Sequence, residues 1–244
     1  MRDSQARPLL CADVGAGPTI LLLHGYGMKP ATYLPTARLL ADRARVVIPD
    51  LFALLERWTF EHALDCLELT LDDLGVERVS LLGHSFGGGV ELGLATRSPE
   101  RVVECVFSDT LGMHREMSLA LEAIHPGGIA RMATPAAVRS FVQSFATHPV
   151  QLVEAALWAF RSDRNSEIDA CVLAGLPCHV LWAERDSILS RKDGKEFAQR
   201  LHATFTVAER PSGYGPIDHD WMFDDPHLFV RHLDRLGLRA LPAT

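Results

Sequence analysis

The clearest chemical feature of this sequence is a serine set among glycines. Residues Gly83-His84-Ser85-Phe86-Gly87-Gly88 fit the pattern G-x-S-x-G. A short apolar run precedes Ser85 and a helix-like segment follows it. This strand–turn–helix setting holds a serine hydroxyl exposed on a tight turn. The start of the helix would also direct backbone N–H groups and a partial positive charge toward the reacting centre. We predict that Ser85 is a nucleophile, and a glycine-rich turn that merely contains a serine is the alternative.

A serine hydroxyl needs a base, and the base needs an acid to orient it. On a fold with this turn, the acid follows the serine along the chain and the base follows the acid. Asp186 comes just after an apolar run that ends at Ala183. The carboxyl ends of parallel strands are where such sheets hold their functional residues. We predict Asp186 as the acid, with Glu184 and Asp109 as competing candidates.

The candidate base is His219, one of eleven histidines. It lies after the last predicted strand and before the last predicted helix, in the loop from which a base can reach Ser85. By contrast, His227 and His232 fall within that last helix. The two aspartates flanking His219 would raise its pKa and favour the charged form, which is a poor base. A surface histidine between two aspartates is the alternative interpretation.

An acyl-transfer site also needs backbone donors for the oxyanion. The N–H of Phe86, the residue after the candidate nucleophile, is the first predicted donor. The segment His24-Gly25-Tyr26-Gly27 follows the first strong apolar run, and its glycines permit close backbone approach. We predict that the N–H of Tyr26 is the second donor, and a plain glycine turn is the alternative.

These residues must be positioned by an alternation of strands and helices. Short apolar runs bounded by turn residues predict buried strands, and longer runs with a helical period predict helices. The predicted strands are 19–23, 45–48, 78–82, 102–107, 178–183 and 204–207, and the predicted helices are 33–42, 60–74, 85–97, 193–201 and 226–236. This order predicts an α/β fold with a doubly wound, mostly parallel sheet and helices on both faces.

The alternation stops between residues 111 and 171, where helical segments occur without a convincing strand. We predict that 111–171 is a helical insertion. The core domain would then consist of residues 1–110 and 172–244.

The sequence resembles the α/β-hydrolase superfamily, and more narrowly its cap-bearing branch of esterases, carbon–carbon hydrolases and epoxide hydrolase-like proteins. The residues that carry the resemblance are His24-Gly25-Tyr26-Gly27, Pro49-Asp50-Leu51, Gly83-His84-Ser85-Phe86-Gly87-Gly88, Glu184-Arg185-Asp186, His219 and Asp225-Pro226. The resemblance implies the same roles for Ser85, Asp186, His219, Tyr26 and Phe86. It also implies that the insertion is a cap over the site. Dehalogenases and epoxide hydrolases of this fold use an aspartate nucleophile, so Ser85 argues against both.

Two segments depart from the family pattern. After Pro49-Asp50-Leu51 a glycine-rich loop is usual, whereas here a short apolar segment leads almost directly into the next helix. The base is usually preceded by glycine, whereas here the segment is Ile217-Asp218-His219. Both changes would alter the surroundings of the site.

Substrate-facing residues are expected from the cap and from the loops beneath it. We expect most bulky apolar side chains of the insertion to pack within the cap: Met113, Met117, Ile124, Met132, Phe141, Phe145, Leu157, Trp158 and Phe160. The predicted substrate pocket consists of His24, His84, Phe141, Phe145, Trp158 and Trp221. His114, Arg115, His125 and Arg131 are alternative contacts for a substrate carboxylate or phosphate, although a solvated surface position is favoured for each.

Composition narrows the class of protein further. The 244 residues are 48% hydrophobic and 23% charged, which suits a single globular core with an insertion. A net charge of −7 without a dense basic cluster disfavours nucleic acid and anionic membranes as partners. No apolar run has the length of a membrane span or signal peptide. The five cysteines have no ligand spacing, so we predict reduced cysteines, a cytoplasmic protein, no metal and no organic cofactor.

Three hypotheses for function follow. The first is hydrolysis of a small or medium, largely apolar carboxylic ester or thioester through an acyl-enzyme on Ser85. The second is carbon–carbon bond hydrolysis of a diketone by the same triad, and the third is a non-catalytic binding protein. The expected partner is a small acyl compound, and a homodimer is a candidate assembly.

Overall fold

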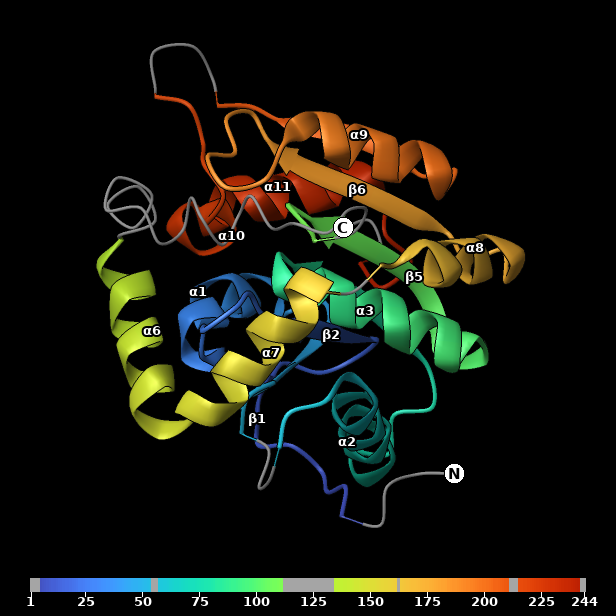
Figure 1. The fold of residues 1–244 in the computed structure, drawn as a ribbon. Coiled ribbons are helices and arrows are strands. Elements are labelled where there is room, and N and C mark those ends of the chain that lie inside the picture. The colour runs from blue at the N-terminus through green and yellow to red at the C-terminus, as the bar shows by residue number, and fades with distance from the viewer. Residues whose placement is uncertain (1–4, 54–56, 112–133, 162, 211–214, 242–244) are drawn as a thin grey trace.

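The fold is built on one seven-stranded sheet (Figure 1). The computed structural model describes residues 5–53, 57–111, 134–161, 163–210 and 215–241. The strands are β1 (Cys11–Val14), β2 (Thr19–Leu23), β3 (Arg45–Pro49), β4 (Val79–His84), β5 (Val102–Ser108), β6 (Cys178–Ala183) and β7 (Thr204–Ala208). Their order is β1-β3-β2-β4-β5-β6-β7, with β1 antiparallel to β3 and every other pair parallel. The predicted mostly parallel sheet is therefore confirmed.

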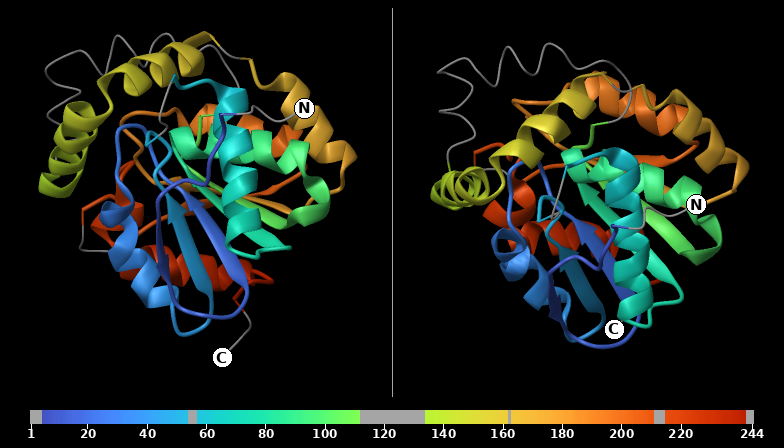
Figure 2. Two further views of the ribbon diagram at one scale, coloured as in Figure 1. Left: turned by 90° about the horizontal axis from the view of Figure 1, so that it is seen from below. Right: turned by 60° about the horizontal axis from the view of Figure 1, so that its bottom comes forward.

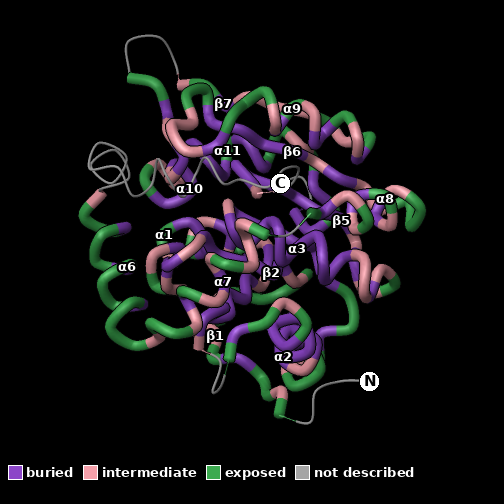
Figure 3. The backbone as a smooth tube through the Cα atoms, in the orientation of Figure 1, coloured by how far each residue is buried: buried purple, intermediate pink, exposed green. Residues whose placement is uncertain are grey.

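Helices cover both faces of this sheet. One face carries α1 (Pro30–Leu40), α10 (Trp221–Asp224) and α11 (Pro226–Leu236), and the other carries α2 (Phe60–Asp73), α3 (Phe86–Arg97), α8 (Asn165–Leu173) and α9 (Arg191–Arg200). Alternate residues of a strand point to opposite faces, so Leu21 and Leu23 of β2 join one core cluster while Ile20 and Leu22 join the other. Figure 3 shows the strands as a buried layer between helices whose outer sides are exposed.

Local sequence explains where several of these helices begin and end. The Thr59 side chain accepts a hydrogen bond from His62 N at the start of α2, and the Asp225 side chain accepts one from Leu228 N at the start of α11. Gly237 ends α11 in the left-handed conformation, with φ 65°. These signals lie in the sequence, and the predicted limits of α2 and α11 agree closely with the structure.

Two described elements were not predicted. Strand β1 is an edge strand of four partly exposed residues, Cys-Ala-Asp-Val, and it is too short and too exposed to stand out in the sequence. Helix α10 is a single turn directly before α11, and it was predicted as loop. Both lie outside the regular strand–helix alternation.

The segment between β5 and β6 supplies three described helices. Besides α8, these are α6 (Pro135–Thr147) and α7 (Pro149–Arg161). In both views of Figure 2, α6 and α7 lie along one end of the strands. The description of 111–171 as a separate cap stays a prediction. Within the described parts of the chain, no helix combines the length and apolar character needed to cross a membrane.

Candidate active site

The predicted site residues follow strands at the point where the sheet changes its direction of winding. The chain runs from β2 outward to β3, and then returns to place β4 on the other side of β2. In open sheets of this type, such a switch point leaves a crevice at the carboxyl ends of the two strands. His24 follows β2 directly and Ser85 follows β4 directly. The topology therefore brings the predicted nucleophile and the glycine segment 25–27 to the same edge.

Ser85 has the backbone conformation of a strained turn. Its φ is 52° and its ψ is −119°, in a region that residues with a Cβ rarely adopt. A Cβ on Gly87 would collide with the carbonyl oxygen of Leu23, and a Cβ on Gly88 would collide with the Thr110 side chain. The glycines therefore permit the close packing that holds Ser85 in this turn, with its side chain half-buried at the start of α3.

Asp186 and His219 form a hydrogen-bonded pair. His219 Nδ1 lies 2.9 Å from Asp186 Oδ2, and both side chains are buried. The other carboxylate oxygen of Asp186 accepts hydrogen bonds from Ile188 N and Leu189 N, each 2.8 Å long. A carboxylate cannot donate, so His219 Nδ1 carries a proton, and in the neutral ring Nε2 is then the acceptor. This is the tautomer that a general base requires.

Charges around the ring control the protonation of His219. Burial acts to lower its pKa, but Asp186 raises the pKa through both charge and hydrogen bond, and Asp220 and Asp109 raise it further. The net direction is upward from the ordinary value of 6.5. The pKa of Asp186 is lowered despite its burial, because His219 and two backbone donors stabilise its charge. Of the flanking aspartates, Asp218 accepts hydrogen bonds from Ser187 N and His219 N, each 2.7 Å long, and so shapes the loop.

A chain of buried polar groups connects the glycine segment with the histidine loop. Gly25 N donates to Tyr33 Oη at 2.9 Å, and Tyr33 Oη lies 2.7 Å from His84 Nδ1. His84 Nε2 lies 3.0 Å from the carbonyl oxygen of His219. Because that carbonyl only accepts, Nε2 carries the proton and Nδ1 accepts from Tyr33. Burial, together with the nearby His219, lowers the pKa of His84 to about 3, so the ring is neutral. Tyr33 was missed by sequence reasoning, because a tyrosine on a predicted helix carries no signal of such a role.

The competing acids occupy different surroundings. Asp109 is fully buried and accepts hydrogen bonds from Ala183 N at 2.7 Å and Trp221 Nε1 at 2.6 Å. Burial and the nearby Asp186 raise its pKa. Glu184 is exposed. The structure thus brings Asp186, rather than Glu184 or Asp109, into hydrogen-bonding contact with His219.

The two predicted oxyanion donors lie on either side of this edge. Phe86 is the first residue of α3, so its N–H has no partner within the helix. Within the described part of the chain, neither Tyr26 N nor Phe86 N donates a hydrogen bond to another backbone group outside helices and strands. The Tyr26 and Phe86 rings pack at a centroid distance of 6.0 Å, which keeps the two segments together.

The residues predicted to line a pocket divide into buried and exposed groups. His24 is fully buried, with Nε2 accepting from Leu51 N and Nδ1 lying 3.0 Å from the carbonyl of Gly25. Trp158 is half-buried and packs on the Phe86 ring at 5.3 Å. Phe141 and Phe145 are 41% and 54% exposed, and the Phe141 ring lies against Gly27 and 6.3 Å from the Tyr26 ring. Their role in substrate contact stays a prediction. His114, Arg115, His125, Arg131, Met113, Met117, Ile124 and Met132 lie outside the described residues.

Helices α6 and α7 are attached directly beside these loops. Tyr26 Oη donates to the carbonyl of Leu152 at 2.8 Å, and Lys29 N donates to Ser140 Oγ at 2.6 Å. Trp58 lies in the apolar segment that departs from the family pattern, and it is buried. Its backbone N–H donates a hydrogen bond to Glu154 Oε2 at 2.7 Å. Part of the insertion is thereby held at the carboxyl edge of the sheet.

The winding of the sheet, the strained serine turn at its switch point and the helices on both faces are the features of an α/β hydrolase. The chain belongs to the alpha/beta hydrolase family, whose model matches residues 20–232.

Relatives with described activities match parts of the chain. A stretch of 122 residues is 34% identical to 2-hydroxy-6-oxo-2,4-heptadienoate hydrolase of Pseudomonas putida F1, over 46% of this chain and 44% of that protein. A stretch of 128 residues is 35% identical to 2-hydroxymuconate semialdehyde hydrolase of Pseudomonas sp. CF600, over 46% of this chain and 43% of that protein. The chain thus matches less than half the length of these curated relatives.

Solved structures match over a longer range. A thermophilic esterase from Thermogutta terrifontis superposes with a TM-score of 0.74 at 20% identity, over 96% of this chain and 94% of that one. At this identity, the likeness concerns the fold.

Proposed function

We propose that this α/β hydrolase is a serine hydrolase that cleaves a small or medium, largely apolar carboxylic ester or thioester through an acyl-enzyme on Ser85. The observation that carries the proposal is the hydrogen bond of 2.9 Å between His219 Nδ1 and Asp186 Oδ2. In the neutral ring this hydrogen bond leaves His219 Nε2 as an acceptor. The backbone carbonyl of His219 accepts a hydrogen bond from His84, the residue that immediately precedes Ser85.

The proposed reaction uses these groups in sequence. Ser85 Oγ attacks the acyl carbonyl carbon while His219 Nε2 takes the hydroxyl proton, and Asp186 stabilises the imidazolium that forms. The carbonyl oxygen becomes an oxyanion, which accepts hydrogen bonds from Tyr26 N and Phe86 N. The C–O or C–S bond then breaks and the leaving group takes the proton from His219. Water, deprotonated by His219, releases the acid and restores Ser85.

The proposed substrate class follows from the aromatic surroundings of the serine turn. Phe86 packs against Phe52 and Trp58 at ring distances of 5.5 Å each, and against Trp158 at 5.3 Å. An apolar acyl group gains by leaving water for such surroundings. Helices α6 and α7 are proposed to act as the cap that covers the acyl group, because they are bonded to the loops beside Ser85.

Carbon–carbon hydrolysis is the second candidate. This candidate is favoured by the partial matches to two hydrolases, one named for 2-hydroxy-6-oxo-2,4-heptadienoate and the other for 2-hydroxymuconate semialdehyde. Such a reaction would use the same Ser85, Asp186 and His219. Its leaving group would be a carbanion that takes up a proton, instead of an alcohol or thiol. Analysis of the products from both substrate classes distinguishes the two candidates.

The test combines a covalent probe with turnover. The protein is treated with a fluorophosphonate, and hydrolysis of p-nitrophenyl acetate and butyrate is followed in the same samples. Ser85→Ala and His219→Ala should abolish labelling and lower kcat by a factor on the order of 10³ or more. Ser166→Ala and His227→Ala, at two exposed positions, are the matched controls and should behave as the parent. A folded parent that is neither labelled nor active with either substrate class would instead support a binding protein.

A further inference from the structure

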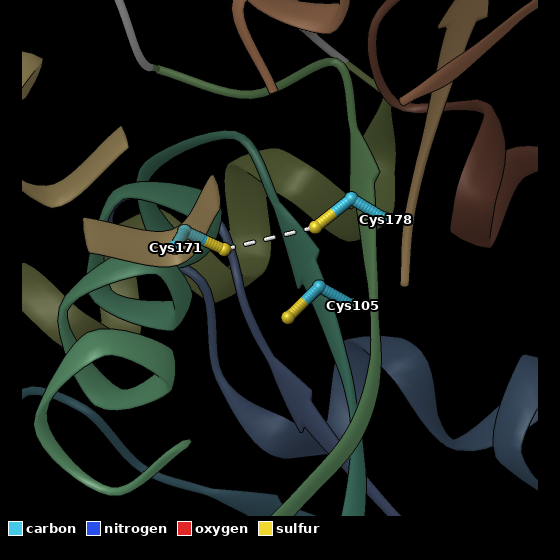
Figure 4. Close-up of side chains that lie close together, drawn as sticks. All are labelled: Cys105, Cys171 and Cys178. Atoms are coloured by element: carbon cyan, nitrogen blue, oxygen red, sulfur yellow. Dashed lines mark hydrogen bonds between the residues drawn. The ribbon is translucent and has the colours of Figure 1, made fainter. Parts of the chain in front are cut away.

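Three cysteines from separate parts of the chain meet in the core away from Ser85. Cys105 lies on β5, Cys178 is the first residue of β6, and Cys171 lies near the end of α8. Cys105 and Cys178 are register partners on adjacent strands. Figure 4 shows the Cys171 and Cys178 side chains pointing toward one another, with Cys105 beside them. None of the three has a part in the proposed ester hydrolysis.

The three sulfur atoms are close enough to bind one ion. Cys171 Sγ and Cys178 Sγ are 3.7 Å apart, and all three sulfur atoms lie within 4.8 Å of one another. A zinc–sulfur bond of about 2.3 Å implies a sulfur–sulfur separation of about 3.8 Å at tetrahedral angles. The Cys171–Cys178 distance matches this edge. All three thiols are buried, so the cluster is also dry.

The chemistry of the three side chains selects the kind of ion. Thiolate is the form that binds metal, and soft sulfur ligands select zinc-like cations over magnesium or calcium.

We propose that Cys105, Cys171 and Cys178 bind one thiophilic divalent cation of the zinc class. Binding forms three metal–sulfur bonds, and it releases to solvent the protons that the three thiols carry. No oxidant or reductant takes part. The ion would join α8, the last helix of the insertion, to β5 and β6 of the sheet. The site is therefore structural, and it does not depend on the chemistry proposed at Ser85.

The test is titration of the fully reduced protein with Cd²⁺, and separately with Co²⁺, under a phosphine reductant. We expect a sulfur-to-metal charge-transfer band that saturates at one ion per chain, and a rise in Tm as the ion binds the folded state. Cys171→Ala and Cys178→Ala should lose the band while remaining folded by circular dichroism. Cys11→Ser, at a partly exposed cysteine outside the cluster, is the control and should bind as the parent.

Several results would overturn the proposal. One is a folded, reduced parent that shows no charge-transfer band with either ion. Another is a band that persists unchanged in both cysteine variants. A third is a Cys171–Cys178 disulfide that forms in air while the reduced protein binds no ion, which would make the cluster a redox pair. Esterase activity is measured in the same samples, so a failure of this proposal is distinguished from a failure at Ser85.

Discussion

In the proposed mechanism, the charge state of His219 sets the pH range in which Ser85 can lose its proton. Only the neutral ring can act as a base, so activity should rise with pH as His219 loses its proton. The pKa of this ring is raised by Asp186 and further by Asp220 and Asp109. The acidic limb of the pH profile of kcat/KM is therefore expected above the ordinary histidine value of 6.5.

Asp220→Asn tests this electrostatic origin. Removing one negative charge next to the ring lowers the pKa of His219, so the acidic limb should move to lower pH. The Asp186 hydrogen bond is untouched, so kcat on the plateau should change little. Asp42→Asn removes a negative charge at an exposed position that is distant from His219 in the sequence, and it should leave the acidic limb in place. A limb that stays fixed or moves upward in Asp220→Asn would contradict the proposed control of His219.

The sequence pointed to Asp186 and His219, which the structure joins by a hydrogen bond, but not to the groups around them. The positions of Asp186 and His219 follow from chain order and from the ends of predicted strands. Tyr33 and Asp109 became meaningful only in three dimensions. Tyr33 serves through a hydroxyl group that reaches His84 across 51 positions of sequence, and no local pattern marks such a contact.

At the scale of elements, the start of α3 depends on glycines, which have no side chain. A Cβ on Gly87 would collide with backbone of Leu23, which has no freedom to move within β2. Gly87→Ala should lower the free energy of unfolding by about 1–3 kcal/mol and disturb the serine turn, so that esterase turnover falls as well. Gly89→Ala, two positions later on the same helix, meets its nearest atom, on the Trp158 ring, at 3.3 Å and is the matched control. Thermal unfolding and turnover of both variants check this, and equal behaviour would refute it.

Trp158 connects α7 to the aromatic surroundings of the serine turn. It packs on Trp58, Phe60 and Phe86 at ring distances of 5.2, 4.8 and 5.3 Å. Trp158→Ala should destabilise the protein by about 2–4 kcal/mol, since it empties a partly buried aromatic position. If the residue also contacts substrate, KM for the butyrate ester should rise more than KM for the acetate ester.

Leu157→Ala is the comparison for Trp158→Ala, because the neighbouring Leu157 is 42% exposed. It should cost less than about 1 kcal/mol. Denaturant unfolding and the two KM values give the result. A uniform change in KM for both esters would leave Trp158 with a packing role alone.

The elements of the sheet were predicted well because their signals are local. Apolar runs such as β2 and β4 end at turn residues, and helices such as α2 carry their own N-terminal cap. Phe141 and Phe145 are partly exposed, and their packing within a cap stays a prediction. Helix α6 buries its small residues Ala137, Ser140 and Ser144 instead. A helical period reveals that a helix has two faces, but not which face meets the core when small residues make the contact.

At the scale of the whole molecule, two buried histidines link stability to pH. Burial lowers the pKa of His24, and it lowers the pKa of His84 to about 3. Below pH 6.5 the unfolded chain binds protons at these rings while the folded chain does not, so the free energy of unfolding falls as pH falls. The slope should reach up to about 1.4 kcal/mol per pH unit for each ring. His219 acts in the opposite direction. Its raised pKa in the folded state stabilises the fold fully well below pH 6.5, where both states bind the proton, and this stabilisation is lost as the pH rises above 6.5.

Urea unfolding at pH 7, 6 and 5 measures this slope. His24→Gln removes one of the two rings and should flatten the dependence, even if the variant is less stable overall. His227→Gln, at an exposed position at the start of α11, should leave the slope as in the parent. Parallel curves for the parent and His24→Gln would show that the buried ring is not the cause.

The hydrogen bond from Gly25 to Tyr33 has a consequence for solvent exchange. The Gly25 amide is bonded to a buried phenol that is itself bonded to His84, so its hydrogen should exchange with deuterium only through a large opening of the molecule. Tyr26, its neighbour, keeps a backbone N–H outside this network. Two adjacent amides should thus differ widely in exchange rate. The Tyr26 N–H, proposed as an oxyanion donor, directly follows the anchored Gly25. Folding therefore positions this donor before any substrate binds.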